Sequence, residues 1–232
     1  MALEATDIRN ADNARAYGDS DTDVWLGRRV KGQDPELPKS SNALTTFAET
    51  YPPLGWLSED GVPFETDTDS EDFTALQGSQ LIKSKITQTT RTATIQALEE
   101  AFRVGSIYWD HGEPKAVDGA ADEVLIDLPG SLSTIDCWAI FKFVDGENFA
   151  IYVWPHVQIT DRGDLDHSNS DLTLYEMTAK FIGDGWMITN NSDYVARLNG
   201  GGSDALPAGK GVTTPTDTGA DTNAPTGDAE TE

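Results

Sequence analysis

The sequence predicts a mainly β protein, an antiparallel β-sandwich or partial barrel with one short α-helix. Several short segments alternate apolar and polar residues, which is typical of half-buried strands. Turn-forming pairs such as Pro129-Gly130 and Asp145-Gly146 separate these segments. No regular alternation of strands and helices is present, so a parallel sheet is not expected.

The strands of the first half follow short turn signals. Residues 23–30 and 54–57 read as strands, and Ser41-Asn42 precedes a short helical pattern over 43–49. A threonine-rich segment, residues 83–94, contains no glycine or proline and favours an extended strand that continues to about residue 98. The helix of the fold is expected over residues 99–108, where apolar side chains recur at helical spacing.

The second half contains the clearest pattern in the chain. Residues 134–144 and 148–160 alternate on either side of Asp145-Gly146, which predicts an antiparallel hairpin. Pro155 predicts an edge or a bulge in its second strand. Further strands are expected over residues 123–128, 172–182 and 186–189.

Composition divides the chain into three parts. Residues 1–22 are polar and predict an N-terminal arm, and residues 23–199 carry the strand patterns of one β domain. Residues 200–232 are rich in glycine, threonine, proline and aspartate and contain no aromatic residue, which predicts a disordered acidic tail.

The charge and the single cysteine exclude several classes of protein. Forty acidic against sixteen basic residues give a net charge of −24, which disfavours binding of nucleic acid through its phosphates. Solubility, a salty host, or a surface along which DNA slides without sticking would each explain this acidity. Cys137 alone cannot form an intrachain disulfide and is expected to be a small core residue. The sequence shows no membrane span and no signal peptide.

The threonine-rich strand has no clean apolar face. Strict alternation places a mostly polar row of side chains on one side of it, and this row consists of Lys83, Lys85, Thr87, Thr89 and Arg91. The opposite side is also mostly polar. A strand of this kind is expected to face water or another subunit on one side.

An acidic run precedes this strand and is expected to be a solvated loop. Its acids are Glu65, Asp67, Asp69, Glu71 and Asp72. Such a run suggests calcium, but an EF-hand count from Asp67 places Asp72 where glycine is required and Gly78 where the bidentate glutamate belongs. The acidic loop at residues 161–171 fails the same count. An irregular calcium site remains an alternative.

The order of these segments resembles a known family. LGWLSEDGV at residues 54–62 is followed by TDSED, ALQG, the threonine-rich strand and ALEE, and DVWLG at residues 23–27 precedes them. This order resembles the major tail tube protein of long-tailed, siphovirus-type bacteriophages, especially those of actinobacterial hosts. The resemblance covers residues 23–199, although its motifs are loose patterns.

The resemblance implies a phage tail-tube fold and a structural virion protein. Subunits of that family self-assemble into stacked, hexameric rings that form a hollow tube for genome passage. The implied partners are further copies of the chain, a tape-measure protein, a tail terminator and baseplate or tip proteins, with DNA passing through the lumen without specific binding and no membrane. The implied location is the virion tail, after assembly in the host cytoplasm.

On that reading the two polar segments receive roles. Residues 83–94 are the candidate strand between subunits and along the lumen, and the acidic run is the candidate contact between rings. No catalytic, cofactor or metal signature is present, including GxSxG, a P-loop, HExxH and GxGxxG, so an enzyme is not expected. The alternative from another class is a monomeric β-sandwich binding module or adhesin whose acidic loops hold calcium.

Overall fold

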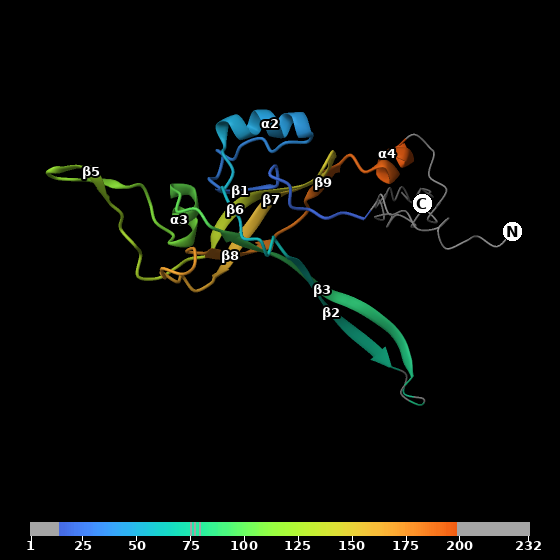
Figure 1. The fold of residues 1–232 in the computed structure, drawn as a ribbon. Helices are drawn as coiled ribbons and strands as arrows, with labels where there is room; N and C mark the ends of the chain where they lie inside the picture. The colour runs from blue at the N-terminus through green and yellow to red at the C-terminus, as the bar shows by residue number, and fades with distance from the viewer. Residues whose placement is uncertain (1–13, 75, 77, 79, 199–232) are drawn as a thin grey trace, which may run out of the picture.

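The computed structural model describes residues 14–74, 76, 78 and 80–198. Its main element is one antiparallel sheet of seven strands, in the order β1-β6-β7-β8-β3-β2 with β9 also paired to β7 (Figure 1). The strands are β1 (Asp23–Arg28), β2 (Phe64–Thr74), β3 (Leu81–Ala97), β6 (Ile135–Asp145), β7 (Asn148–Arg162), β8 (Tyr175–Phe181) and β9 (Trp186–Thr189). The predicted mainly antiparallel β class is confirmed.

The predicted β6–β7 hairpin forms the centre of this sheet. Gly146 has a φ of +60°, which the tight turn between the strands requires, and Asp145 pairs with Asn148 across it. The pairing register shifts where Ala139 lies opposite Trp154 and Cys137 lies opposite Val157. This irregularity contains Pro155, as the sequence predicted, because proline cannot donate to the ladder.

The shift at Pro155 also divides the far edge of β7. Residues 150–153 pair with β9, whereas β8 pairs with β7 from Val157 onward. Along this edge β7 therefore has two neighbours, β9 before Pro155 and β8 after it, and the sheet curls at this point. One continuous, curled sheet takes the place of the two separate layers of an ideal sandwich.

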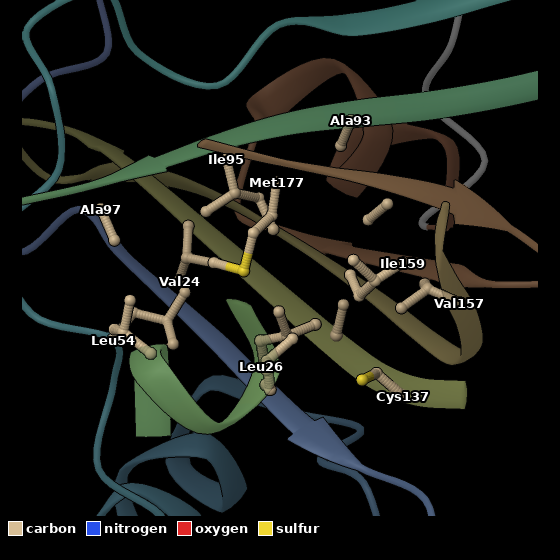
Figure 2. Close-up of a cluster of buried hydrophobic side chains, with 14 of the residues drawn as sticks. Val24, Leu26, Leu54, Ala93, Ile95, Ala97, Cys137, Val157, Ile159 and Met177 are labelled. Carbon is tan, nitrogen blue, oxygen red and sulfur yellow. The ribbon is translucent and has the colours of Figure 1, made fainter. Parts of the chain in front are cut away.

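The larger core fills the inner face of the curled sheet (Figure 2). It combines Val24 of β1, Ile95 of β3, Phe141 of β6, Ile159 of β7 and Met177 of β8, all with no exposed surface. The helix α3 (Phe102–Tyr108) closes one end through Val104 and Ile107. Burial of this apolar surface is the main source of stability in the domain.

A smaller core lies on the opposite face, under helix α2 (Ser41–Thr50). Leu44 and Phe47 of α2 pack on Trp25, Trp138, Ile140, Ile151 and Val153. The helix begins where Ser40 accepts a hydrogen bond from the Ala43 amide at 3.1 Å, one residue before the predicted cap. Most of β6 is therefore buried on both faces, which explains why its two alternating rows of residues are mostly apolar.

Cys137 is a core residue, as predicted. It has no exposed surface, and burial raises the pKa of its thiol to about 12. The thiol is therefore unreactive in the folded protein.

Several elements differ from the sequence predictions. The acidic run is strand β2 and not a loop, because β3 supplies it with a hydrogen-bonding partner along its length. The segment at residues 54–57 is not a strand: it makes an isolated bridge from Leu57 to Ala97, and the Leu54 amide donates to the Val24 carbonyl at 2.7 Å. The described residues contain three helices: α2 lies where the helical pattern over residues 43–49 predicted it, α3 begins later than predicted, and α4 (Ser192–Leu198) was not predicted.

A second, two-stranded sheet consists of β4 (Lys115–Val117) and β5 (Ala120–Leu125). The strand predicted at residues 123–128 is thus shifted toward the N-terminus. The predicted acidic tail at residues 200–232 and most of the predicted N-terminal arm lie outside the described residues. Within the described part of the chain, none of the helices has the length and apolar character that crossing a membrane requires.

Candidate assembly surfaces

The β2–β3 hairpin leaves the sheet and projects far from the body of the protein (Figure 1). β8 pairs with β3 only from Thr92 to Ala97, so among the described strands the outer part of β3, residues 81–91, has only β2 as a neighbour. All residues of β2 are exposed, and so are those of the outer part of β3 except the half-buried Thr90. The outer part of the hairpin therefore has two exposed faces and two free strand edges, one on β2 and one on β3.

The root of this hairpin is fixed by an aromatic cluster. The ring of Phe64, the first residue of β2, makes edge contacts with Phe141 at 5.0 Å and Phe181 at 5.5 Å between ring centroids. Phe181 in turn stacks on Trp154 at 4.0 Å. These contacts hold the start of the projection on the core, while its outer part depends on strand pairing and on β-branched threonines.

The hairpin brings together the two segments that the sequence singled out. Asp67 lies opposite Thr90 and Glu71 lies opposite Lys85, so the acidic run and the threonine-rich strand are the two halves of one structure. The pairing register shifts after Asp69, so that no residue of β2 lies opposite Thr87. This extra residue changes the alternation of β3, and Lys83 and Lys85 share a face with Gln88. Thr89 and Arg91 point to the other face. The single polar row expected from strict alternation is therefore divided between two faces.

The two strands of the hairpin carry opposite charge. β2 contains five acids and no base, whereas β3 contains Lys83, Lys85 and Arg91 and no acid. None of these side chains forms an ion pair within the described part of the chain. Near the tip, large apolar side chains are also exposed, namely Phe73, Leu76, Leu81, Ile82 and Ile86.

A second projection, which we call the arm, comprises residues 112–132 with the β4–β5 sheet at its centre. It extends from the side of the body opposite to the β2–β3 hairpin (Figure 1). Five large apolar side chains are exposed on it, namely Val124, Leu125, Ile126, Leu128 and Leu132. The sequence predicted a strand in this segment, but no pattern in it indicated that its apolar side chains would be exposed to solvent.

The two ends of the arm are tied together at Asp110 and Ser133. The backbone amide and the hydroxyl of Ser133 both donate to the Asp110 carboxylate, at 3.2 and 2.5 Å. Arg28 of β1 forms an ion pair with the same carboxylate at 3.0 Å, and Arg162 donates to the Ser133 carbonyl at 3.3 Å. Asp110 adopts a left-handed backbone with a φ of +55°.

These partners change the acidity of Asp110. Partial burial raises the pKa of its carboxyl, but the hydrogen bonds from Ser133 and Arg28 outweigh burial, and the pKa lies below its ordinary value of 3.8. The carboxylate therefore stabilises the folded protein above that pH. The stabilisation is lost as the pH falls through the lower pKa of the folded state.

Replacing Asp110 by asparagine tests this anchor. Asparagine tolerates the left-handed backbone, so Asp110→Asn removes the charge without adding strain. We expect the free energy of unfolding to fall by about 1.5–3 kcal/mol at pH 7, the usual contribution of hydrogen bonds to a charged group. The difference from the parent protein should shrink below pH 3.8 in urea titrations. A difference that stays constant with pH would contradict the role of the charge.

A cleft of about 820 Å³ lies beside the root of the hairpin. Its lining combines aromatic and acidic side chains, among them Tyr17, Trp56, Asp23, Glu59 and Glu99. Burial is the main cause that raises the pKa of Asp23, which Lys142 partly offsets. The Trp56 amide donates to Glu99 at 2.9 Å, so one of these carboxylates already has a backbone partner.

The acidic segments do not bring their carboxylates together. In β2, alternate residues on one face lie about 6.6–6.8 Å apart because of the strand rise, whereas a calcium ion takes its oxygen ligands at about 2.3–2.6 Å. Across the described ranges, no group of three or more histidine, cysteine, aspartate or glutamate residues has the arrangement of a metal site. His156 is instead hydrogen-bonded to Asp136 at 2.8 Å.

Comparisons with known proteins give matches among solved structures. No family model matches the chain, and no curated protein matches it. Two similar solved structures are described as the virion of a native gene transfer agent particle and the tail of an empty gene transfer agent particle with C6 symmetry. Each has a TM-score of 0.36 and 12% sequence identity. The alignment with the first spans 71% of this chain and 95% of the matched chain, and the alignment with the second spans 70% of this chain and 93% of the matched chain.

Proposed function

We propose that this protein is a structural subunit of a phage-type tail tube, which self-assembles into stacked rings around a lumen. The observation that carries the proposal is the β2–β3 hairpin, whose outer part has exposed faces and, within the described part of the chain, an unpaired edge on each strand. A free edge of this length is a template for pairing with another chain. The sequence resemblance to tail tube proteins supplies the kind of assembly, with six copies per ring.

The hairpin is then a contact between subunits. Lys83, Lys85, Thr87, Thr89 and Arg91 belong to the strand proposed to join subunits and to approach the lumen. Glu65, Asp67, Asp69, Glu71 and Asp72 belong to the strand proposed to contact the neighbouring ring. Because the two strands are paired, any contact that engages one of them lies beside the other.

The charge of the hairpin agrees with passage of DNA. The bases of β3 alone would attract phosphates, but the five acids of β2 outnumber the three bases, and the hairpin is net acidic. The whole chain carries a net charge of −24. A lumen built from such subunits repels the DNA backbone and does not retain it.

Electron microscopy of the purified full-length protein tests this proposal. Rings or hollow tubes are expected at high protein concentration in negative stain, with matching large species in size-exclusion light scattering. A chain that stays monomeric over the whole range of concentration and salt would overturn it. The calcium-module alternative makes a separate prediction, that a chelator lowers the melting temperature sharply. The tube subunit should melt at the same temperature with and without the chelator.

A further inference from the structure

The arm has the features of a surface that is covered in the assembled state. A two-stranded sheet by itself is only marginally stable in water, and β4–β5 is not paired to the main sheet. Its five exposed apolar side chains lie on the same short segment of about ten residues, residues 124–132. Clusters of this kind on a protein surface mark sites of protein–protein contact.

The charge of the arm limits what can cover it. Residues 112–132 contain five acids and one base. That base, Lys115, already forms an ion pair with Asp127. Asp122 and Glu123 of β5 are exposed and form no ion pair within the described part of the chain. The partner surface should therefore be apolar and basic.

One surface of this chain has that composition. The outer part of β3 carries Lys83 and Lys85 next to exposed Leu81, Ile82 and Ile86. It also has an unpaired edge, and so does β5, which pairs only with β4 among the residues that the structure describes. The large cleft is a poor alternative, because its lining contains acidic residues and no lysine or arginine, whereas β3 carries three bases and no acid.

We infer that the arm of one subunit docks on the outer part of β3 of a second copy of this chain, by edge-to-edge strand pairing of β5 with β3. Within one chain the two surfaces cannot meet, because the arm and the hairpin project from opposite sides of the body (Figure 1). The contact therefore joins unlike surfaces of successive copies. A head-to-tail contact of this type generates rings or helical filaments and not closed dimers.

The inference rests on the proposed self-assembly and adds the residues that specify it. Asp122 and Glu123 bring negative charge to the joint, where the next copy carries Lys83 and Lys85 on one face of β3. The apolar side chains of β5 and β3 supply the buried surface, and the main-chain hydrogen bonds of the two free edges supply the alignment. Because the charges at this joint are opposite, the arm of each copy binds β3 of the next copy and not a second arm.

Two charge-reversed variants test the contact. The arm variant carries Asp122→Lys and Glu123→Lys, and the hairpin variant carries Lys83→Glu and Lys85→Glu. All four side chains are exposed, so both variants are expected to fold. Each variant alone presents like charges at every joint, and assembly should require a roughly tenfold or higher protein concentration, or fail.

An equimolar mixture of the two variants should assemble again. The positive arm of one variant then meets the negative hairpin of the other, and at the next joint the unaltered negative arm meets the unaltered positive hairpin. Copies must alternate, so native mass spectrometry should find equal numbers of the two variants in each ring. A control with Glu147→Lys and Asp184→Lys, which makes the same charge change in exposed turns, should assemble as the parent does.

Cross-linking provides a readout that does not need complete rings. Chains with Leu125→Cys are mixed with chains carrying Ile82→Cys, Ser84→Cys or Ile86→Cys and oxidised mildly; buried Cys137 does not compete. Disulfide-linked pairs of the two different chains are expected. If the parent assembles but the variants assemble equally well alone, or the mixture is not restored, the inference fails and the tube proposal stands. If the parent does not assemble, the tube proposal fails, and absence of the cross-link then overturns the inference as well.

Discussion

Shortening the β2–β3 hairpin is expected to abolish assembly while leaving the monomer folded. Thr68 lies directly opposite Thr89, so residues 69–88 can be replaced by Asn-Gly, a pair that forms the tight turn of a two-residue hairpin. Every described residue in the removed segment is exposed, and the aromatic contacts of Phe64 at the root are kept. The shortened chain loses residues 81–88 of the free β3 edge, including the lysines that the arm would contact.

The measurement compares both properties in the same samples. Circular dichroism and thermal unfolding of the shortened chain should match those of the parent to within a few degrees, since no core residue is removed. Light scattering and electron microscopy should show monomers at concentrations where the parent forms rings. If the shortened chain still forms rings, the hairpin does not hold the subunits together. A collapse of its melting temperature would show that the hairpin supports the monomer fold.

Replacing Phe141 by alanine is expected to give the largest loss of stability of any single substitution considered. Phe141 lies on the central strand β6 with no exposed surface, in edge contact with Phe64 and with Phe181 at 6.0 Å. Its removal takes apolar surface from the core and leaves a cavity, which together cost about 3–5 kcal/mol. For a domain of this size, that corresponds to a fall in melting temperature of roughly 6–20 °C.

Phe73→Ala is the matched control for this substitution. Phe73 is 44% exposed, near the tip of the hairpin, and its replacement should change the free energy of unfolding by no more than about 0.5 kcal/mol. Both variants replace phenylalanine by alanine, so a difference between their free energies of unfolding in urea reports the burial of the side chain and not its chemistry. Equal losses in the two variants would contradict the assignment of Phe141 to the core and of Phe73 to the projection.

The structural features that the sequence predicted correctly are those determined by residues close together in the chain. The β6–β7 hairpin follows from alternation on either side of Asp145-Gly146, and the irregularity at Pro155 follows from the missing amide of proline. The threonine-rich strand is confirmed as β3, because its β-branched residues favour an extended backbone wherever they are placed. The burial of Cys137 likewise follows from its position in an apolar alternating segment.

The acidic run was misread because its local signals conflict with its structure. Acidic residues are depleted in strands, and β2 has no buried face to mark its period. Its extended conformation depends on hydrogen bonds to β3, a partner that local patterns do not identify. The register shift that separates Lys85 from Thr89 is equally a property of the pair of strands.

The sequence by itself determined the β class, the central hairpin, the net charge and the polar character of the segments proposed for assembly. Only the tertiary structure decided that those two segments form one projecting hairpin, and that Val124, Leu125 and Ile126 lie uncovered on an arm. The physical reason is that strand order and exposure depend on contacts between residues far apart in the chain, such as Val24 with Phe141 and Ile95 with Met177. Three consecutive apolar residues look the same in a sequence whether they pack in the core of their own subunit or remain exposed for contact with a second subunit.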